Sequence, residues 1–292
     1  MTGKTEQDRP PAGRQAASAA EGYALGYSQT EFKRLEMQAL LLKELTADVL
    51  RRAGLAPGMR VLDLGCGVGD VSLLAADLVG PSGHVLGIDR SADMVSIAKR
   101  RADHAGKGSW VEFRTAELDS FDSARTFDAV IGRLVLMYLP DPAAALRRLL
   151  GFVVPGGLAV FHEMAMPMSR SVPEGPLFRR SIDWLRDTFR AAGFETDMCS
   201  KLAGTFVAAG LPQPQLTLGG IAGSGPDTPV HNYLVGTLRS LLPMGERFGV
   251  FTAAEADLDT LGERLRAEAE SLGACMMPPP LVGAWARKAA GV

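Results

Sequence analysis

The sequence predicts an α/β fold in which helices cover both faces of a doubly wound parallel sheet. Two observations support this prediction. Short apolar runs between residues 60 and 162 alternate with longer helical patterns, which is typical of βαβ units with parallel strands. A glycine-rich turn at residues 65–69 separates the first apolar run from the next helix, and such turns lie at the carboxyl edge of parallel sheets.

The expected elements follow one another closely along the chain. A first helix is expected from about residue 30 to 52, where Leu35, Leu42 and Val49 lie near one face. The apolar runs predict strands at 60–64, 84–88, 110–114, 127–131 and 158–162. The intervening patterns predict helices at 70–79, 91–103 and from Pro142 onward. The back half predicts helices at 176–192, 199–209 and 229–272, the last broken at Pro243, and strands at 213–218 and 281–287.

The composition indicates a soluble globular protein. Of the 292 residues 47% are hydrophobic and 22% charged, and 31 Lys and Arg oppose 33 Asp and Glu. Without a basic excess, nucleic acid is not expected as a partner. Three scattered cysteines, Cys66, Cys199 and Cys275, and the lack of an apolar leader predict a cytoplasmic location. No apolar run approaches the roughly 18 residues that a membrane-spanning helix requires, so no membrane partner is expected.

Changes in composition along the chain predict its domain organisation. Residues 1–22 lack apolar periodicity and are expected to form a disordered tail. Residues 23–56 are expected to form a helical arm, and residues 57–292 the sheet domain. Two stretches, about 164–196 and 225–275, are not required by the sheet and are expected to form a helical lid. We expect a monomer or a homodimer.

The glycine-rich turn discriminates between two classes of nucleotide cofactor. Dinucleotides are bound by Gly-x-Gly-x-x-Gly, whose third glycine would fall at position 70, but that residue is Asp70. Its negative charge would repel a pyrophosphate. Asp89, at the end of the second strand, can accept hydrogen bonds from both hydroxyls of a ribose. A cationic sulfonium cofactor without phosphates is compatible with both Asp63 and Asp70.

Several motifs resemble those of the class I S-adenosylmethionine (SAM)-dependent methyltransferases. Residues 61–70, Val-Leu-Asp-Leu-Gly-Cys-Gly-Val-Gly-Asp, are similar to motif I of that family. Residues 87–91 are similar to its acidic ribose-binding motif, and residues 115–118 to its adenine-edge motif. Residues 127–133 resemble the fourth strand and the loop that faces the methionine part, and Pro155-Gly156-Gly157 resembles the turn into the fifth strand. The resemblance covers about residues 23–165 and implies a Rossmann-like fold with a seven-stranded sheet.

The resemblance also implies which residues bind SAM, and that the arm caps it. Asp89 is expected to bind the ribose, Met94 to lie under the adenine, and Cys66 to offer its backbone N–H. Tyr27 or Arg34 is expected to hold the methionine carboxylate. The full set of expected cofactor residues is Tyr27, Arg34, Gln38, Asp63, Gly65, Cys66, Gly67, Asp89, Arg90, Met94, Glu117, Leu118 and Arg133.

Three residues are candidates for a general base. His162 and Glu163 end the fifth strand, at the edge where a transferred methyl group must lie, and point to opposite faces of the sheet. His231 lies in the second insertion, although it is as readily interpreted as a surface histidine. No metal-binding cluster is expected. A further set of apolar residues predicts either a substrate pocket or plain core packing: Met164, Met166, Met168, Phe178, Trp184 and Phe189.

The sequence therefore predicts an enzyme that transfers the methyl group of SAM to a small-molecule acceptor, in secondary metabolism, by in-line displacement. Two alternatives stay open at this point. One is an NAD-dependent oxidoreductase, which Asp70 disfavours. The other is a SAM-binding protein without transferase activity.

Overall fold

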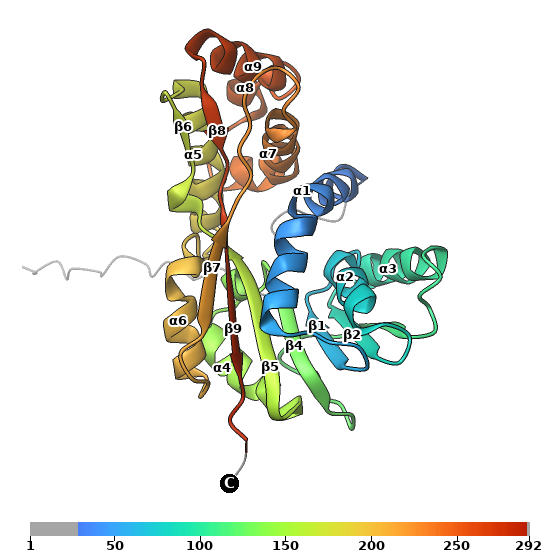
Figure 1. Ribbon diagram of the computed structural model, residues 1–292. Helices are drawn as coiled ribbons and strands as arrows, with labels where there is room; N and C mark the ends of the chain where they lie inside the picture. Colours follow the sequence, from blue (N-terminus) through green and yellow to red (C-terminus); the bar gives the residue numbers. More distant parts are fainter. Residues whose placement is uncertain (1–28, 291–292) are drawn as a thin grey trace, which may run out of the picture.

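The sheet predicted from the sequence is the centre of the computed structural model, which describes residues 29–290 (Figure 1). It has seven strands in the order β3-β2-β1-β4-β5-β9-β7. Their bounds are β1 Arg60–Leu64, β2 His84–Asp89, β3 Val111–Thr115, β4 Phe127–Arg133, β5 Val153–Met164, β7 Gln215–Gly219 and β9 Leu281–Arg287. The five neighbouring strands β3, β2, β1, β4 and β5 pair in parallel, and β9 is antiparallel to both of its neighbours, β5 and β7. The predicted doubly wound α/β class is confirmed, with one antiparallel strand inserted near the edge.

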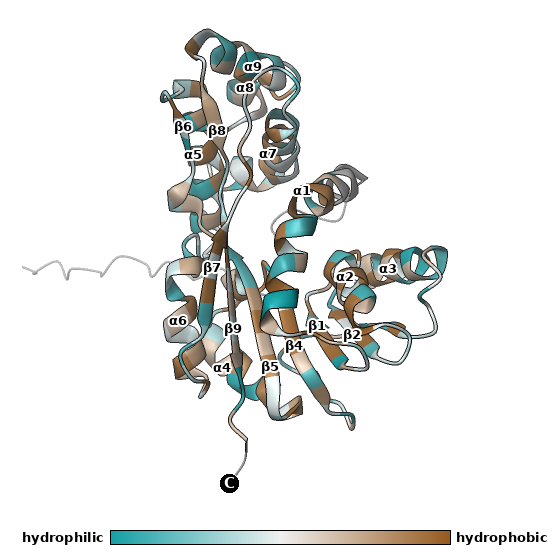
Figure 2. Ribbon diagram, in the orientation of Figure 1, coloured by the Kyte–Doolittle hydropathy of each residue, from teal (hydrophilic) through white to brown (hydrophobic). Residues whose placement is uncertain are grey.

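Helices cover both faces of this sheet. One face is covered by α1 (Gln29–Ala53), α2 (Asp70–Val79) and α3 (Ala92–His104), and the other by α4 (Pro142–Leu149) and α6 (Met198–Ala208). Each face has its own hydrophobic core, because successive residues of a strand point to opposite sides. In β5, for example, Val160 packs on the α1 face and Phe161 on the α6 face. Figure 2 shows the hydrophobic middle of β4 between these layers.

The two predicted insertions form one layer beyond the carboxyl ends of the strands (Figure 1). It contains α5 (Pro176–Ala191), α7 (Val230–Arg247), α8 (Ala253–Ala256) and α9 (Leu261–Leu272). The two insertions are joined by the antiparallel pair of β6 (Arg170–Val172) and β8 (Cys275–Met277). In addition, the Glu268 carboxylate of α9 accepts the backbone N–H groups of Leu177 and Phe178 at the start of α5, at 2.7 and 3.0 Å. Carboxylates are favoured there because the first N–H groups of a helix have no partner inside it.

The predicted helix break at Pro243 is wrong. Proline removes one backbone hydrogen bond, but α7 continues through it to Arg247. Leu241 is fully buried just before the proline, and Gly245 just after it lies so close to Phe251 that an added Cβ would be 2.3 Å from the ring. Packing on both sides of Pro243 therefore outweighs its local preference.

Two further sequence expectations concern the ends and the membrane. The predicted tail at 1–22, and the arm as far as residue 28, lie outside the described residues. Within residues 29–290, no helix is both long and apolar enough to cross a membrane.

Candidate functional site

A cavity of about 690 Å³ opens at the carboxyl edge of the sheet. It lies between the ends of β1, β2, β4 and β5, helix α1, and the layer that contains α5 and α7. Of the thirteen residues expected to bind a cofactor, Tyr27 lies outside the described residues. The others all line this cavity: Arg34, Gln38, Asp63, Gly65, Cys66, Gly67, Asp89, Arg90, Met94, Glu117, Leu118 and Arg133.

The glycines of the turn after β1 have different physical roles. All three have a left-handed backbone, with φ of 57° at Gly65, 52° at Gly67 and 87° at Gly69. A Cβ at Gly65 would lie 2.7 Å from the side chain of Val135, and one at Gly69 would lie 2.9 Å from Phe113. A Cβ at Gly67 would meet nothing within 4 Å. Gly65 and Gly69 therefore permit tight packing, whereas Gly67 leaves space open at the wall of the cavity.

The carboxylate of Asp89 fixes this turn to the end of β2. Its Oδ2 accepts the N–H of Gly67 at 2.9 Å, and its Oδ1 accepts the N–H of Ser91 at 2.9 Å. Ser91 in turn caps α3 by accepting the N–H of Met94, whose side chain is buried against the cavity. Each carboxylate oxygen can accept a second hydrogen bond, so Asp89 can still receive donors from the cavity.

The expectation for the backbone of Cys66 is wrong. Its N–H donates to the carbonyl of Ile88 at 3.0 Å, so this donor already has a partner inside the sheet edge. The side chain is buried, and burial raises the pKa of the thiol well above its usual value. Cys66 thus offers a small apolar surface to the cavity, and its thiol is not activated.

Asp63 presents an unpaired oxygen to the cavity. The residue is 1% exposed, and its Oδ2 accepts a hydrogen bond from the Ser72 hydroxyl at 2.6 Å. No partner of Oδ1 is found within residues 29–290. Burial raises the pKa of Asp63 to about 7. Since buried polar atoms are nearly always hydrogen-bonded, Oδ1 is available to accept a hydrogen bond from a ligand in the cavity.

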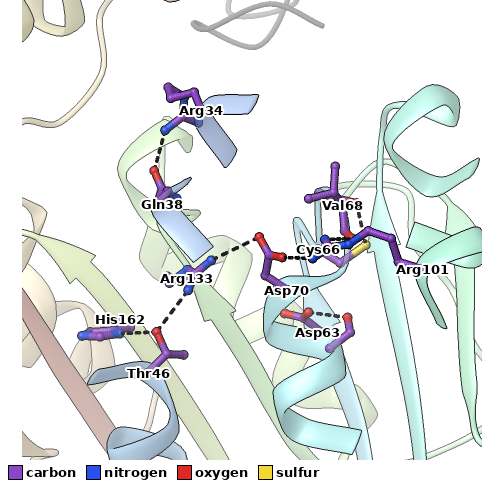
Figure 3. A network of polar contacts seen from close by, with 12 residues as sticks. Arg34, Gln38, Thr46, Asp63, Cys66, Val68, Asp70, Arg101, Arg133 and His162 are labelled. Carbon is purple, nitrogen blue, oxygen red and sulfur yellow. Dashed lines mark hydrogen bonds and ion pairs between the residues drawn. The ribbon is translucent and has the colours of Figure 1, made fainter. Parts of the chain in front are cut away.

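A buried cation, Arg133, lies near Asp63 at the end of β4 (Figure 3). Its guanidinium donates to the hydroxyl of Thr46 at 3.2 Å and lies 3.8 Å from the Asp70 carboxylate. Asp70 is also paired with Arg101 at 2.7 Å. Burial lowers the pKa of Arg133, while the carboxylates of Asp70 and Asp63 oppose this effect. The cavity therefore contains a cation of fixed position beside an unpaired carboxylate oxygen.

Helix α1 covers this region with two polar residues. Arg34 and Gln38 are one helical turn apart, and the guanidinium donates to the Gln38 amide oxygen at 2.5 Å (Figure 3). Both side chains are buried, at 4% and 6% exposure. Helical spacing predicts that one face presents both residues, and the structure confirms this placement.

None of the three residues expected to act as a base lines the cavity. The His162 ring points to the α1 face of the sheet, where its Nδ1 lies 3.4 Å from the Thr46 hydroxyl. Burial and the nearby Arg133 lower its pKa to about 3, so the imidazole is neutral. His162 supports the residue that holds Arg133, and the structure gives it no access to a substrate.

Glu163 points to the opposite face and holds the loop after β4. Its Oε1 accepts the N–H groups of Val135 and Leu136 at 3.0 and 2.8 Å, and the side chain is fully buried. The loop residue before them, Leu134, has a left-handed backbone with φ of 55°. This conformation is strained for a leucine, so the clamp by Glu163 helps to maintain it.

His231 is also placed away from the cavity. It is 1% exposed, so it is not the surface histidine of the alternative interpretation either. Its charged neighbours, Arg266 and Glu270, belong to α9, and burial lowers its pKa. Other residues of α7, Tyr233, Leu234 and Thr237, line the cavity instead.

The sequence reasoning missed much of the wall formed by the back half. Met164, Met166 and Phe189 do line the cavity, whereas Phe178 and Trp184 belong to the hydrophobic core and Met168 is 48% exposed. The loop after β4 could have been expected from its place at the edge of the sheet. No local signal marks the segment before β9, which contributes Pro278 and Pro279. In the described part of the chain, no cluster of three or more potential metal ligands is found.

The buried Glu163 carboxyl makes stability depend on pH. Its pKa is raised from 4.5 to about 7 in the folded protein, chiefly by burial. Glu163→Gln keeps the oxygen that accepts two N–H groups but cannot ionise. Below pH 4.5 the stability difference between the two proteins should not vary with pH, because Glu163 is then protonated in both the folded and the unfolded state. As pH rises from 4.5 to about 7 the wild type should lose roughly 2–3 kcal/mol relative to the variant, because its charged form is disfavoured by folding.

Urea unfolding of both proteins from pH 4 to 8 measures this difference. Asp63 also has a raised pKa, but it is present in both proteins and its effect cancels. A stability difference that is constant over this range would contradict the ionisation of a buried Glu163.

Comparison with known proteins agrees with the motifs and the sheet order. Residues 55–189 match a family model described as a methyltransferase domain. The chain is 36% identical over 121 residues to phosphoethanolamine N-methyltransferase 1 of Triticum aestivum, covering 41% of this chain and 24% of that protein. It is 37% identical over 114 residues to 2-phytyl-1,4-naphtoquinone methyltransferase of Synechococcus elongatus, covering 39% of this chain and 49% of that protein. The chain thus spans no more than about half the length of these two relatives.

A similar fold is found in the solved structure of the YcgJ protein from Bacillus subtilis. The TM-score is 0.56 at 16% identity, and the match covers 85% of this chain and all of that one. At this identity the likeness shows the shared fold only. The family model shows that residues 55–189 form a methyltransferase domain, and the motifs and the sheet order around it resemble those of the class I SAM-dependent methyltransferases.

Proposed function

We propose that this protein transfers the methyl group of SAM to a small-molecule acceptor bound in the same cavity. One observation carries this proposal: a single cavity is lined by all twelve described cofactor candidates and continues into a second region beneath α5 and α7. A site of this kind can hold a cofactor and an acceptor next to each other. The methyltransferase relatives are the second line of support.

The residues of the cavity fit the parts of SAM. The ribose hydroxyls would be held by Asp89, and the adenine by Met94 and the Glu117–Leu118 segment. The ammonium group of the methionine part would supply the donor that Asp63 Oδ1 lacks. Its carboxylate would be bound by Arg133 or by Arg34, both of which are buried cations at the wall. The open space at Gly67 gives the cofactor room close to the backbone.

Bound SAM supplies an electrophilic methyl group on a positively charged sulfur. On transfer, the acceptor's lone pair would form the new bond to carbon, the electrons of the carbon–sulfur bond would stay on sulfur, and any acceptor proton would pass to solvent when the site opens to release the product. The protein contributes position and the exclusion of water. His162, Glu163 and His231 do not line the cavity, so the structure gives none of them a direct role as a base.

The layer of α5 and α7–α9 is suited to act as the lid, since α5 and α7 line the cavity on the side away from the sheet edge. Arg34 of α1 lies against this layer, with its Cγ 3.8 Å from the position of a Cβ at Gly236. The arm and the lid would thus enclose the methionine part from two sides. The free cysteines Cys66, Cys199 and Cys275 suit a cytoplasmic protein.

The first test concerns the space at Gly67. Gly67→Ala should weaken binding of S-adenosylhomocysteine at least tenfold, because the added methyl group occupies that space. Gly156→Ala is the matched control: Gly156 has φ of 77°, an added Cβ would again meet nothing within 4 Å, and it does not line the cavity. Both variants should be less stable than the wild type by about 1–2 kcal/mol, because alanine is strained in the left-handed backbone conformation that glycine adopts at these positions. Equal affinity of the two variants in calorimetry would remove Gly67 from the cofactor site.

The second test separates the methionine part from the nucleoside. Asp63→Asn should weaken the binding of S-adenosylhomocysteine roughly 10-fold or more, because a charge-assisted hydrogen bond to the ammonium group is lost. Affinity for 5′-methylthioadenosine, which has no amino-acid part, should not change. In the wild type, S-adenosylhomocysteine should bind more tightly at pH 8 than at pH 6, since the pKa of Asp63 is about 7 and the anion is the better partner. An equal loss for both ligands would place Asp63 away from the ammonium group.

The third test asks whether methyl transfer takes place. The protein is incubated with methyl-labelled SAM and a metabolite extract of its host, and labelled products are identified by mass spectrometry. A labelled small molecule that depends on intact Gly67 is the expected result. Tight binding of SAM with no labelled product in any extract would favour the alternative of a SAM-binding protein without transferase activity.

A further inference from the structure

The cavity has two halves of different chemistry. Every charged side chain on its wall comes from α1 or from the edge formed by residues 63–133: Arg34, Asp63, Asp70, Asp89, Arg90, Glu117, Asp119 and Arg133. We call the remainder the acceptor half. Its lining residues come from the segments 137–140, 164–166, 185–194, 233–237 and 278–279, and among those described none carries a charge.

An aromatic wall forms part of the acceptor half. The rings of Tyr138 and Phe194 meet edge to face, with centroids 4.9 Å apart and an angle of 75°. Phe189 completes the group, with its centroid 6.1 Å from each of the other two. The three rings contact one another and line the cavity together, so they form an apolar surface in the acceptor half.

A charged acceptor would be poorly stabilised in this half. An ionised group that enters an apolar region loses its water and requires a counter-charge or several hydrogen bonds. The buried cations of the cavity lie in the other half, where Arg133 contacts Asp70 and Thr46 and Arg34 contacts Gln38. The acceptor half instead offers aromatic rings, Leu185 and methionines such as Met166, which favour apolar ligands.

We infer that the acceptor is an uncharged, largely apolar molecule that packs against the wall of Tyr138, Phe189 and Phe194. This inference rests on the proposed function, because it assigns the region next to the proposed SAM site. It distinguishes the chain from a relative such as the phosphoethanolamine methyltransferase of Triticum aestivum, whose name specifies a substrate with a phosphate and an amine.

The test compares two probes that share one ring system and differ in charge. Binding of 2-naphthol and of 2-naphthyl phosphate to the full chain is measured by calorimetry, with and without saturating S-adenosylhomocysteine. We expect 2-naphthol to bind at least tenfold more tightly than 2-naphthyl phosphate in both conditions. Tighter or equal binding of the phosphate, or no binding of either probe, would overturn the inference.

A matched pair of variants locates the probe. Phe194→Ala removes one ring of the wall. It should weaken the binding of 2-naphthol at least fivefold without changing the affinity for S-adenosylhomocysteine. Phe152→Ala is the control, since Phe152 is also half-buried and pairs edge to face with Phe121 at 5.3 Å, but does not line the cavity. If Phe194→Ala fails to fold, Phe194→Leu takes its place. Unchanged 2-naphthol affinity in the folded wall variant would contradict the assignment.

The design separates this inference from the proposed function. Failure of S-adenosylhomocysteine to bind the wild type would overturn the cofactor proposal, whereas 2-naphthol binding to the cofactor-free protein would still report on the acceptor half. Normal S-adenosylhomocysteine binding together with a preference for the phosphate probe would overturn the acceptor class alone.

Discussion

The buried guanidinium of Arg133 is the contact on which the arrangement of the site depends. A buried ion is stable only when partners replace its water, and here the partners come from α1 through Thr46 and from the start of α2 through Asp70. Asp70 is held in turn by Arg101 of α3. One cation at the end of β4 thus requires α1, α2 and α3 to be correctly packed. The same packing of α1 brings Arg34 and Gln38 over the cavity.

The two neighbouring residues at the end of β5 show why position at a sheet edge does not define a catalytic role. Successive strand residues face opposite layers, so His162 contacts Thr46 of α1 while Glu163 holds the loop after β4. Both side chains are buried, and neither lines the cavity. Both therefore act on the site through another group. His162 acts through Thr46, which accepts a hydrogen bond from Arg133, and Glu163 acts through the strained loop that begins at Leu134.

The parts of the fold that local chemistry determines were predictable from the sequence. The strand and helix around Gly65–Gly69 follow from apolar periodicity and glycine spacing, and the residues that line the charged part of the cavity follow from motifs at the ends of β1, β2 and β4. Contacts between distant segments were not predictable. The hydrogen bond that occupies the Cys66 N–H comes from the next strand, the support for Pro243 comes from Phe251, and Pro278 reaches the cavity from a segment far along the chain. No local pattern encodes such pairings.

The two halves of the cavity also differ in how much of each lies within the family-model match. The family model matches residues 55–189, which include every charged lining residue except Arg34. The acceptor half extends beyond this match, because Phe194, Tyr233, Leu234 and the prolines before β9 belong to later segments. The family model therefore covers most of the charged part of the wall, whereas the uncharged part includes segments outside the match. Under the proposed function, these side chains would select the acceptor, and their lack of charge is the property that would restrict the choice most.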